Sequence, residues 1–230
     1  MSRGKGRKGT AKRPTKHPVV VVAGEDRNDR ASLRILLEAV CPQMRGRIVE
    51  ISDDVRLHKA TGENLTSRIR TLARKVKARA QREKADVACV FIHEDFDRPD
   101  GAAWTAAHAK VEQELSKSLG TGHYVLAAAE MEAWLLLFPG ALADTVTTWQ
   151  IPERRVGRDT GRMADPKRIL MTEVTGKGGR KYRESDAPEV VRNIVDNGHL
   201  SAPQGTNRSL DRFNEDARVC GEKHIGSGKG

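Results

Sequence analysis

Two hydrophobic patterns alternate along the first 140 residues of the chain. Short apolar runs predict buried strands at residues 19–22, 47–51, 87–92 and 124–129. Apolar residues at helical spacing predict helices at 32–40, 63–84, 102–119 and 130–138. Because strands and helices alternate, we predict an α/β fold whose mostly parallel sheet is flanked by helices.

The pattern changes after Gly140. Short helical segments are expected near 141–148, 165–174, 187–196 and 209–219, with links rich in glycine and charge between them. We therefore divide the chain into a disordered basic tail at 1–17, an α/β core at 18–140, and a small helical C-terminal extension at 141–230 that packs on the core.

Charge is distributed unevenly between these parts. The 230 residues carry a formal net charge of +10, and seven basic residues with no acid lie within the first sixteen. The other 214 residues are therefore close to +3, which excludes a uniformly basic, histone-like protein. No apolar run approaches the roughly 20 residues that cross a membrane, and no secretory apolar stretch follows the tail.

The three cysteines, Cys41, Cys89 and Cys220, are far apart and form no CxxC pair. This spacing suggests neither a disulfide framework nor a structural zinc site, so we expect reduced thiols and a cytoplasmic location.

Acidic residues follow three of the predicted strands. Glu25 follows the first, Asp95 and Asp97 the third, and Glu130 and Glu132 the fourth. The carboxyl ends of parallel strands meet at one edge of a sheet, so these side chains are expected to converge. A single acid after a strand is ordinary, since loops are polar and helix N-termini favour negative charge. The combination favours a site for Mg²⁺ or Mn²⁺, which bind carboxylate oxygens.

These residues resemble a Toprim domain, the metal-binding fold of topoisomerases, primases and OLD-family nucleases. The chain looks most like a family of small bacterial Toprim-like proteins of unknown function. The matching segments span about residues 19–213 and are VVVVAGEDRNDRASLRILL, VFIHEDFDRPDG, AAEMEAWLL, DPKRIL, RESDAPEVV and SLDRF.

The resemblance implies Mg²⁺-dependent cleavage of nucleic acid, with Glu25, Asp95 and Asp97 as metal ligands. Glu130 or Glu132 would bind a second ion or orient water. The resemblance also implies a role in phage defence and a partner ATPase subunit of the OLD or ABC kind.

The sequence departs from the family pattern in two respects. Toprim domains commonly carry a glycine after or beside the first glutamate, whereas here Gly24 precedes Glu25 and Asp26 follows it. Many such nucleases also carry a lysine near the last acidic strand, and none lies between Tyr124 and Gly140.

Basic segments supply the expected contacts to nucleic acid. One is the basic face of the 63–84 helix, although a helix face exposed to solvent would also carry such charges. The others are two sets of residues: Arg3, Lys5, Arg7, Lys8, Lys12 and Arg13 in the tail, and Lys177, Arg180 and Lys181 in a loop. We expect Trp134 to fill the core, and Trp104 and Trp149 to pack rather than stack on bases. The alternative functions are a non-catalytic subunit docked on an ATPase and a nucleic-acid-binding accessory protein.

Overall fold

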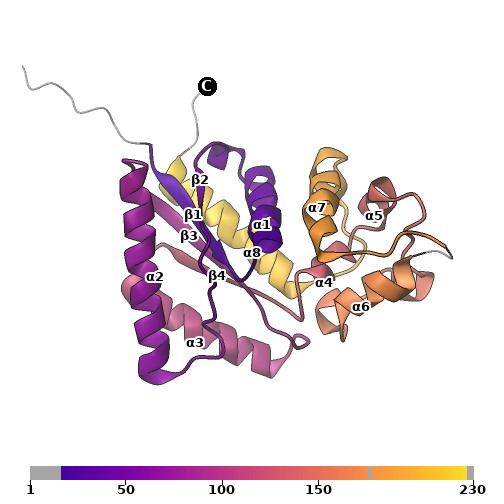
Figure 1. Ribbon diagram of the computed structural model, residues 1–230, viewed down its shortest axis with the longest axis horizontal. Coiled ribbons are helices and arrows are strands. Elements are labelled where there is room, and N and C mark those ends of the chain that lie inside the picture. Colours follow the sequence, from indigo (N-terminus) through magenta and orange to yellow (C-terminus); the bar gives the residue numbers. More distant parts are fainter. Residues whose placement is uncertain (1–16, 176–177, 227–230) are drawn as a thin grey trace, which may run out of the picture.

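The computed structural model describes residues 17–175 and 178–226 and confirms the predicted fold class. Four parallel strands form one sheet in the order β2-β1-β3-β4, flanked by helices (Figure 1). The tail residues from Arg3 to Arg13, and Lys177 of the basic loop, lie outside the described residues. No helix in the described part of the chain is long and apolar enough to cross a membrane.

The strands lie close to their predicted positions. They are β1 (Val19–Gly24), β2 (Ile48–Ile51), β3 (Val87–Asp95) and β4 (Gly122–Ala127). β3 continues three residues beyond its predicted end, because His93, Glu94 and Asp95 still pair with β4. Asp95, which was expected to follow the strand, therefore belongs to the strand itself, and Asp97 follows it.

Helices cover both faces of the sheet. On one face, α2 (Gly62–Arg82) and α3 (Ala102–Ser118) pack on Val21 and Ile92. On the other face, α1 (Arg27–Val40) and α8 (Arg208–Cys220) pack on Val22 and Phe91. α1 begins five residues before its predicted start, because the Asp26 side chain accepts a hydrogen bond from the Asp29 amide and caps the helix.

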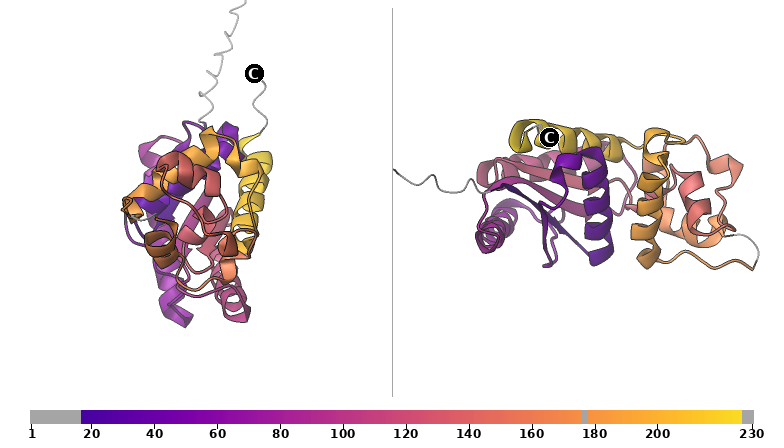
Figure 2. Two further views of the ribbon diagram at one scale, coloured as in Figure 1. Left: turned by 90° about the vertical axis from the view of Figure 1, so that its right-hand side faces the viewer. Right: turned by 90° about the horizontal axis from the view of Figure 1, so that it is seen from above.

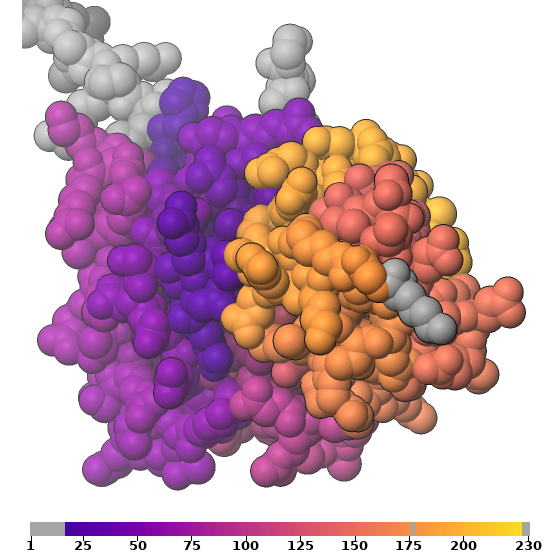
Figure 3. All heavy atoms as spheres, turned by 45° about the vertical axis from the view of Figure 1, so that its right-hand side comes forward, coloured from indigo at the N-terminus to yellow at the C-terminus, as the bar shows by residue number. Residues whose placement is uncertain are grey.

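The C-terminal region lies beyond the carboxyl edge of the sheet, and α8 then returns alongside the strands (Figure 2). Its elements include α4 (Glu132–Leu135), α5 (Pro139–Thr145), α6 (Pro166–Ile169) and α7 (Ala187–Asp196). The predicted 130–138 helix is reduced to a short turn, and α6 passes into a π-helical turn at Leu170–Val174. α7 packs against α1, and Figure 3 shows the orange C-terminal surface directly against the indigo part of the core.

The three tryptophans fill the interior, as predicted. Trp104, Trp134 and Trp149 are each at most 2% exposed. The indole nitrogens of Trp104 and Trp134 donate to Leu126 O and Ser209 Oγ, so these side chains satisfy their polar atoms within the core.

The expectation of fully reduced thiols is wrong for this structure. A disulfide joins Cys89 on β3 to Cys220 at the end of α8, across 131 residues of sequence. Cys41 is a free, buried thiol. No local sequence pattern relates these two cysteines, because only folding brings α8 onto β3.

Candidate metal-binding site

The five predicted site acids all emerge at the carboxyl edge of the sheet. β1 ends at Gly24, which is in register with His93, and β3 ends at Asp95, which is in register with Ala127. Glu25, Asp97 and the Glu130–Glu132 segment follow these strand ends directly. The backbone positions of these acids therefore lie at one edge of the sheet, as predicted.

The side chains divide into two groups on opposite faces of the sheet. Successive residues of a strand point to opposite faces. Glu94 accordingly faces the α2–α3 side, whereas His93 and Asp95 face the α1 side. Glu25, His58, Glu94 and Asp97 make up what we call the Glu25 group. Asp29, Asp95, Glu130 and Glu132 make up the Asp95 group. The expected ligand set of Glu25, Asp95 and Asp97 is thus distributed over both.

Glu94 organises the Glu25 group. Its fully buried carboxylate accepts hydrogen bonds from the Leu57 amide at 2.6 Å and from the His58 amide at 3.2 Å. It also lies 2.7 Å from His58 Nδ1, which leaves His58 Nε2 buried without a hydrogen-bond partner. A ligand oxygen of Glu25 lies within 4.8 Å of ligand atoms of both residues.

Glu25 itself is half-buried at the surface of this group. Burial, then the charges of Glu94 and Asp97, raises the pKa of Glu25. Lys59 partly offsets this charge from the solvent side, where its Nζ lies 2.8 Å from Asp97 Oδ2.

The Asp95 group is more crowded and more enclosed. Asp95 Oδ1 accepts from the Met131 amide at 2.9 Å, and Glu130 Oε2 accepts from the Lys167 amide at 3.1 Å. Glu132 is 6% exposed and its Oε1 accepts from the Tyr182 hydroxyl at 3.3 Å. A cavity of about 20 Å³ lies between Asp29, Asp95 and Glu132. That volume is sufficient for a single water molecule or ion.

These carboxyl groups are short of compensating positive charge. Burial raises the pKa of Asp29 to about 7, reinforced by Asp26, and burial raises the pKa of Glu132 to about 7. Burial, with the charges of Asp29 and Glu132, also raises the pKa of Asp95 well above its ordinary value. Raised carboxyl pKa values of this origin are typical of functional sites.

One ammonium group faces these acids. Lys167 lines the cavity and its Nζ lies 3.0 Å from Glu184 Oε1. Although burial opposes its charged form, the attraction of Glu132 raises the net pKa of Lys167. Lys167 belongs to the DPKRIL segment, so a lysine lies beside these acids although none lies between Tyr124 and Gly140.

His93 lies beneath the Asp95 group and has no hydrogen-bond partner on either ring nitrogen. Its Nδ1 is 3.6 Å from Asp29 Oδ2 and its Nε2 is 3.7 Å from Asp95 Oδ1. Burial lowers the pKa of His93 to about 4, so the ring is neutral near pH 7. A neutral ring supplies little charge to the two carboxylates it separates.

The loops after β3 and β4, which carry the acids, each contain a residue in the left-handed backbone conformation. Asp97 and Ala129 have φ values of 60° and 59°, uncommon for residues other than glycine. Hydrogen bonds from Asp97 N to Ala129 O and from Ala129 N to Arg98 O join the two loops. The loop after β3 and the loop after β4 therefore form one unit that positions Asp95, Glu130 and Glu132.

The described basic residues predicted to contact nucleic acid do not line the cavity of the Asp95 group. Arg180 pairs with Asp186 at 2.8 Å and lies over the Trp149 ring, a structural use of its charge, while Lys181 is exposed. On α2, the exposed Arg70, Arg74 and Lys77 line a groove of about 820 Å³. The basic face of α2 therefore borders a surface groove.

Three residues of the two groups were not singled out from the sequence, namely Asp29, His58 and Glu94, and neither was the neighbouring Lys167. Asp29, Glu94 and Lys167 lie within segments that carry the resemblance. His58 and Glu94 lie 36 residues apart, so no helix or strand periodicity in the sequence indicates that they are in contact.

Comparisons of the chain with protein-family models, curated proteins and solved structures found no significant match. The Toprim-like relationship therefore stays a prediction from the sequence.

Proposed function

We propose that this protein hydrolyses phosphodiester bonds of nucleic acid with a divalent cation, Mg²⁺ or Mn²⁺, held by the Asp95 group. The observation that carries the proposal is the largely buried cluster of Asp29, Asp95 and Glu132 around a cavity of ion size, with raised carboxyl pKa values. The unpartnered His93 ring beneath it is a second sign that the group is incomplete.

The residues fit a hard cation, because the donors are carboxylate oxygens. Asp29 and Asp95 would hold it, and their side chains stay 15% and 17% exposed, so a phosphate can approach from the surface. The bound cation would polarise a phosphoryl oxygen and activate a water.

Two further side chains have roles that follow from their charge. Lys167 carries an ammonium group beside Glu130 and Glu132 and can attract a phosphate oxygen. Glu132, with a pKa of about 7, can take up or release a proton at its carboxyl group near neutral pH. Glu25 and Asp97, which share the same edge, would orient substrate or water from the other face of the sheet.

Asp95→Asn tests the proposal, with the exposed Asp53→Asn as a matched control outside the site. We expect wild type and Asp53→Asn to cleave DNA or RNA only when Mg²⁺ or Mn²⁺ is added, and Asp95→Asn to lose both cleavage and Mn²⁺ binding measured by calorimetry. Cleavage in EDTA, unchanged cleavage by Asp95→Asn, or no cleavage of any DNA or RNA substrate would refute hydrolysis.

The groove on α2 favours a second candidate function, binding of nucleic acid without cleavage. Its three basic residues recur at spacings of four and three, so their side chains share one helix face. In this case Arg74→Glu would weaken binding of nucleic acid. It would also reduce the slope of log affinity against log salt concentration by about the amount that one phosphate contact contributes. Asp95→Asn would bind nucleic acid as tightly as wild type. Gel-shift titrations at several salt concentrations separate the two functions.

A further inference from the structure

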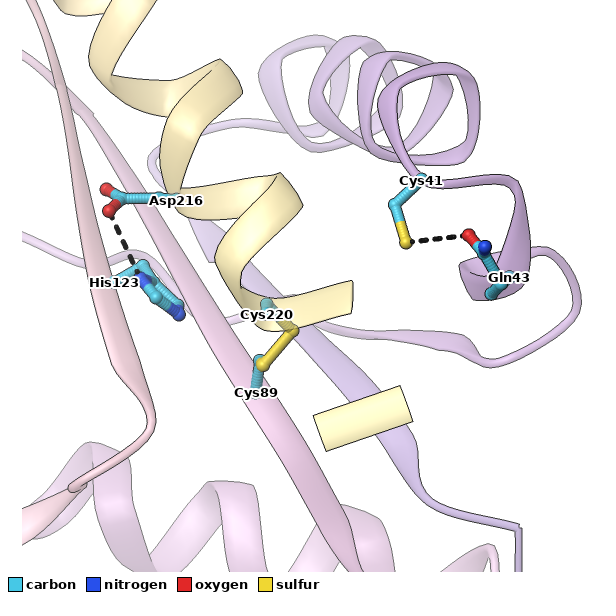
Figure 4. The surroundings of a disulfide bond; sticks show 6 residues. All are labelled: Cys41, Gln43, Cys89, His123, Asp216 and Cys220. Atoms are coloured by element: carbon cyan, nitrogen blue, oxygen red, sulfur yellow. Dashed lines mark hydrogen bonds and ion pairs between the residues drawn. A yellow bond between two sulfur atoms is a disulfide. The ribbon is translucent and has the colours of Figure 1, made fainter. Parts of the chain in front are cut away.

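A further group of potential metal ligands, separate from the two acidic groups, lies at the opposite end of the sheet. Cys89 is near the start of β3, His123 is near the start of β4, and Cys220 ends α8 (Figure 4). One ligand atom from each lies within 4.8 Å of the other two. Both cysteines are fully buried, whereas the His123 side chain is 16% exposed and gives the group a route to solvent.

Neighbouring side chains hold the imidazole in place. His123 Nδ1 lies 3.5 Å from Asp216 Oδ1, and the ring stacks on Phe91 at 4.8 Å between centroids. Asp216 lies one helical turn before Cys220, and its Oδ2 is buried without a hydrogen-bond partner. In Figure 4 the ring lies between Asp216 and the sulfur pair, with Nδ1 toward Asp216. A carboxylate on one nitrogen of a histidine leaves the other nitrogen for a metal ion.

We propose that the Cys89–Cys220 pair is a redox-gated site for a thiophilic divalent cation, with Zn²⁺ as the best fit. Reduction of the disulfide by a dithiol adds two electrons and two protons and yields two thiols, while the dithiol becomes a disulfide. Binding of Zn²⁺ to both sulfurs and to His123 Nε2 then releases those two protons. Asp216 is a positioning residue, because it acts through His123.

Charge and ligand type support this choice of ion. Two thiolates neutralise one divalent cation, so the buried group gains no net charge. Cys₂His is an established zinc ligand set with a fourth position for water, and thiolates disfavour Mg²⁺. Zn–S bonds of about 2.3 Å in a tetrahedral site place the sulfurs about 3.8 Å apart, so the pair must separate when it changes from disulfide to metal site.

The site would serve a different purpose from the acidic groups. It joins α8 to β3 in either state, through the disulfide under oxidising conditions and through the cation under reducing conditions, and the cation would also join both to the edge strand β4 through His123. The inference does not depend on the proposed hydrolysis.

The test uses wild-type protein, oxidised or reduced with a phosphine, exposed to Zn²⁺ and then desalted. We expect one bound Zn²⁺ per chain in the reduced protein and none in the oxidised protein. With Co²⁺ as a probe, the reduced protein should show a thiolate charge-transfer band. Zn²⁺ should also protect Cys89 and Cys220, but not Cys41, from alkylation when the sites are mapped by mass spectrometry.

Variants identify the ligands. Cys41→Ser is the matched control and should bind like wild type, since Cys41 contacts Gln43 instead. Cys220→Ser should abolish the charge-transfer band of a two-thiolate site. Asp216→Asn should weaken Zn²⁺ binding about 10–100-fold. Circular dichroism accompanies each measurement. Absence of bound ion in the reduced wild type, folded or not, overturns the proposal, as does Zn²⁺ binding that Cys41→Ser removes.

Discussion

Glu132→Gln should stabilise the metal-free protein at alkaline pH. Glu132 is 6% exposed, and burial raises the pKa of its carboxyl group from 4.5 to about 7. Glutamine keeps an oxygen that can accept the hydrogen bond of the Tyr182 hydroxyl, but it removes the titratable charge. The substitution therefore isolates the free energy cost of ionising this one group in the folded chain.

The sign and the magnitude follow from the two pKa values. Between pH 4.5 and 7 the folded state keeps a proton that the unfolded chain has lost, so the free energy of unfolding falls as the pH rises. One pH unit corresponds to about 1.4 kcal/mol, and the interval therefore gives a penalty of about 3 kcal/mol that is complete above pH 7. The attraction of Lys167 is already included, since it acts on the same pKa.

Urea unfolding at pH 4 and pH 8 in EDTA measures the effect. We expect Glu132→Gln to match wild type at pH 4 and to exceed it by up to about 3 kcal/mol at pH 8. The exposed Glu153→Gln is the control and should change neither value by more than about 0.5 kcal/mol. A stability difference that is the same at both pH values, or a loss at pH 8, would refute the account of Glu132.

Two further predictions concern the same site and the helix that covers the sheet. Mg²⁺ at 100 times its dissociation constant should stabilise wild type by about 2.7 kcal/mol in thermal unfolding and leave Asp95→Asn unchanged; equal stabilisation of both would remove Asp95 from the site. Asn207→Ala should cost about 1–2 kcal/mol in urea unfolding, because the Asn207 side chain caps α8 by accepting from the Ser209 and Leu210 amides. Asn207→Ser keeps a capping acceptor and, like Asn207→Ala, loses the hydrogen bond that Asn207 Nδ2 donates to Thr160 Oγ1, so it should cost less than Asn207→Ala; equal losses would show that the cap is not responsible.

The sequence predicted the elements of the core well because buried parallel strands carry a strong local signal. Val19–Val22 and Val87–Ile92 are apolar at nearly every position, and few other structures accommodate such runs. Boundaries were less well predicted, since they depend on tertiary contacts. β3 extends through Asp95 because β4 supplies partners, and the 130–138 helix shortens where the chain enters the C-terminal region.

The candidate site was predicted only in part, because its position depends on the order of the strands and its side-chain contacts depend on where each strand ends. That Glu25, Asp95 and Glu132 lie at one edge follows from parallel strands alone. Which of them face one another depends on where each strand stops. Side chains point alternately to the two faces of the sheet only within a strand. If β3 had ended at Ile92, as predicted, Glu94 and Asp95 would have lain in a loop, and this rule would not have placed them on opposite faces. With three more residues in the strand, Glu94 joins Glu25 and His58, and Asp95 joins Asp29 and Glu132.

By itself the sequence determined the α/β class, the parallel sheet and the edge at which the acids gather, because these depend on local apolar runs and their order. Only the tertiary structure decided three things that involve residues far apart in the chain. It divided the acids between two faces, it brought Lys167 to the Asp95 group, and it placed Cys220 and His123 beside Cys89. Each results from packing against a particular face, and packing of distant segments leaves no periodic signal in the sequence.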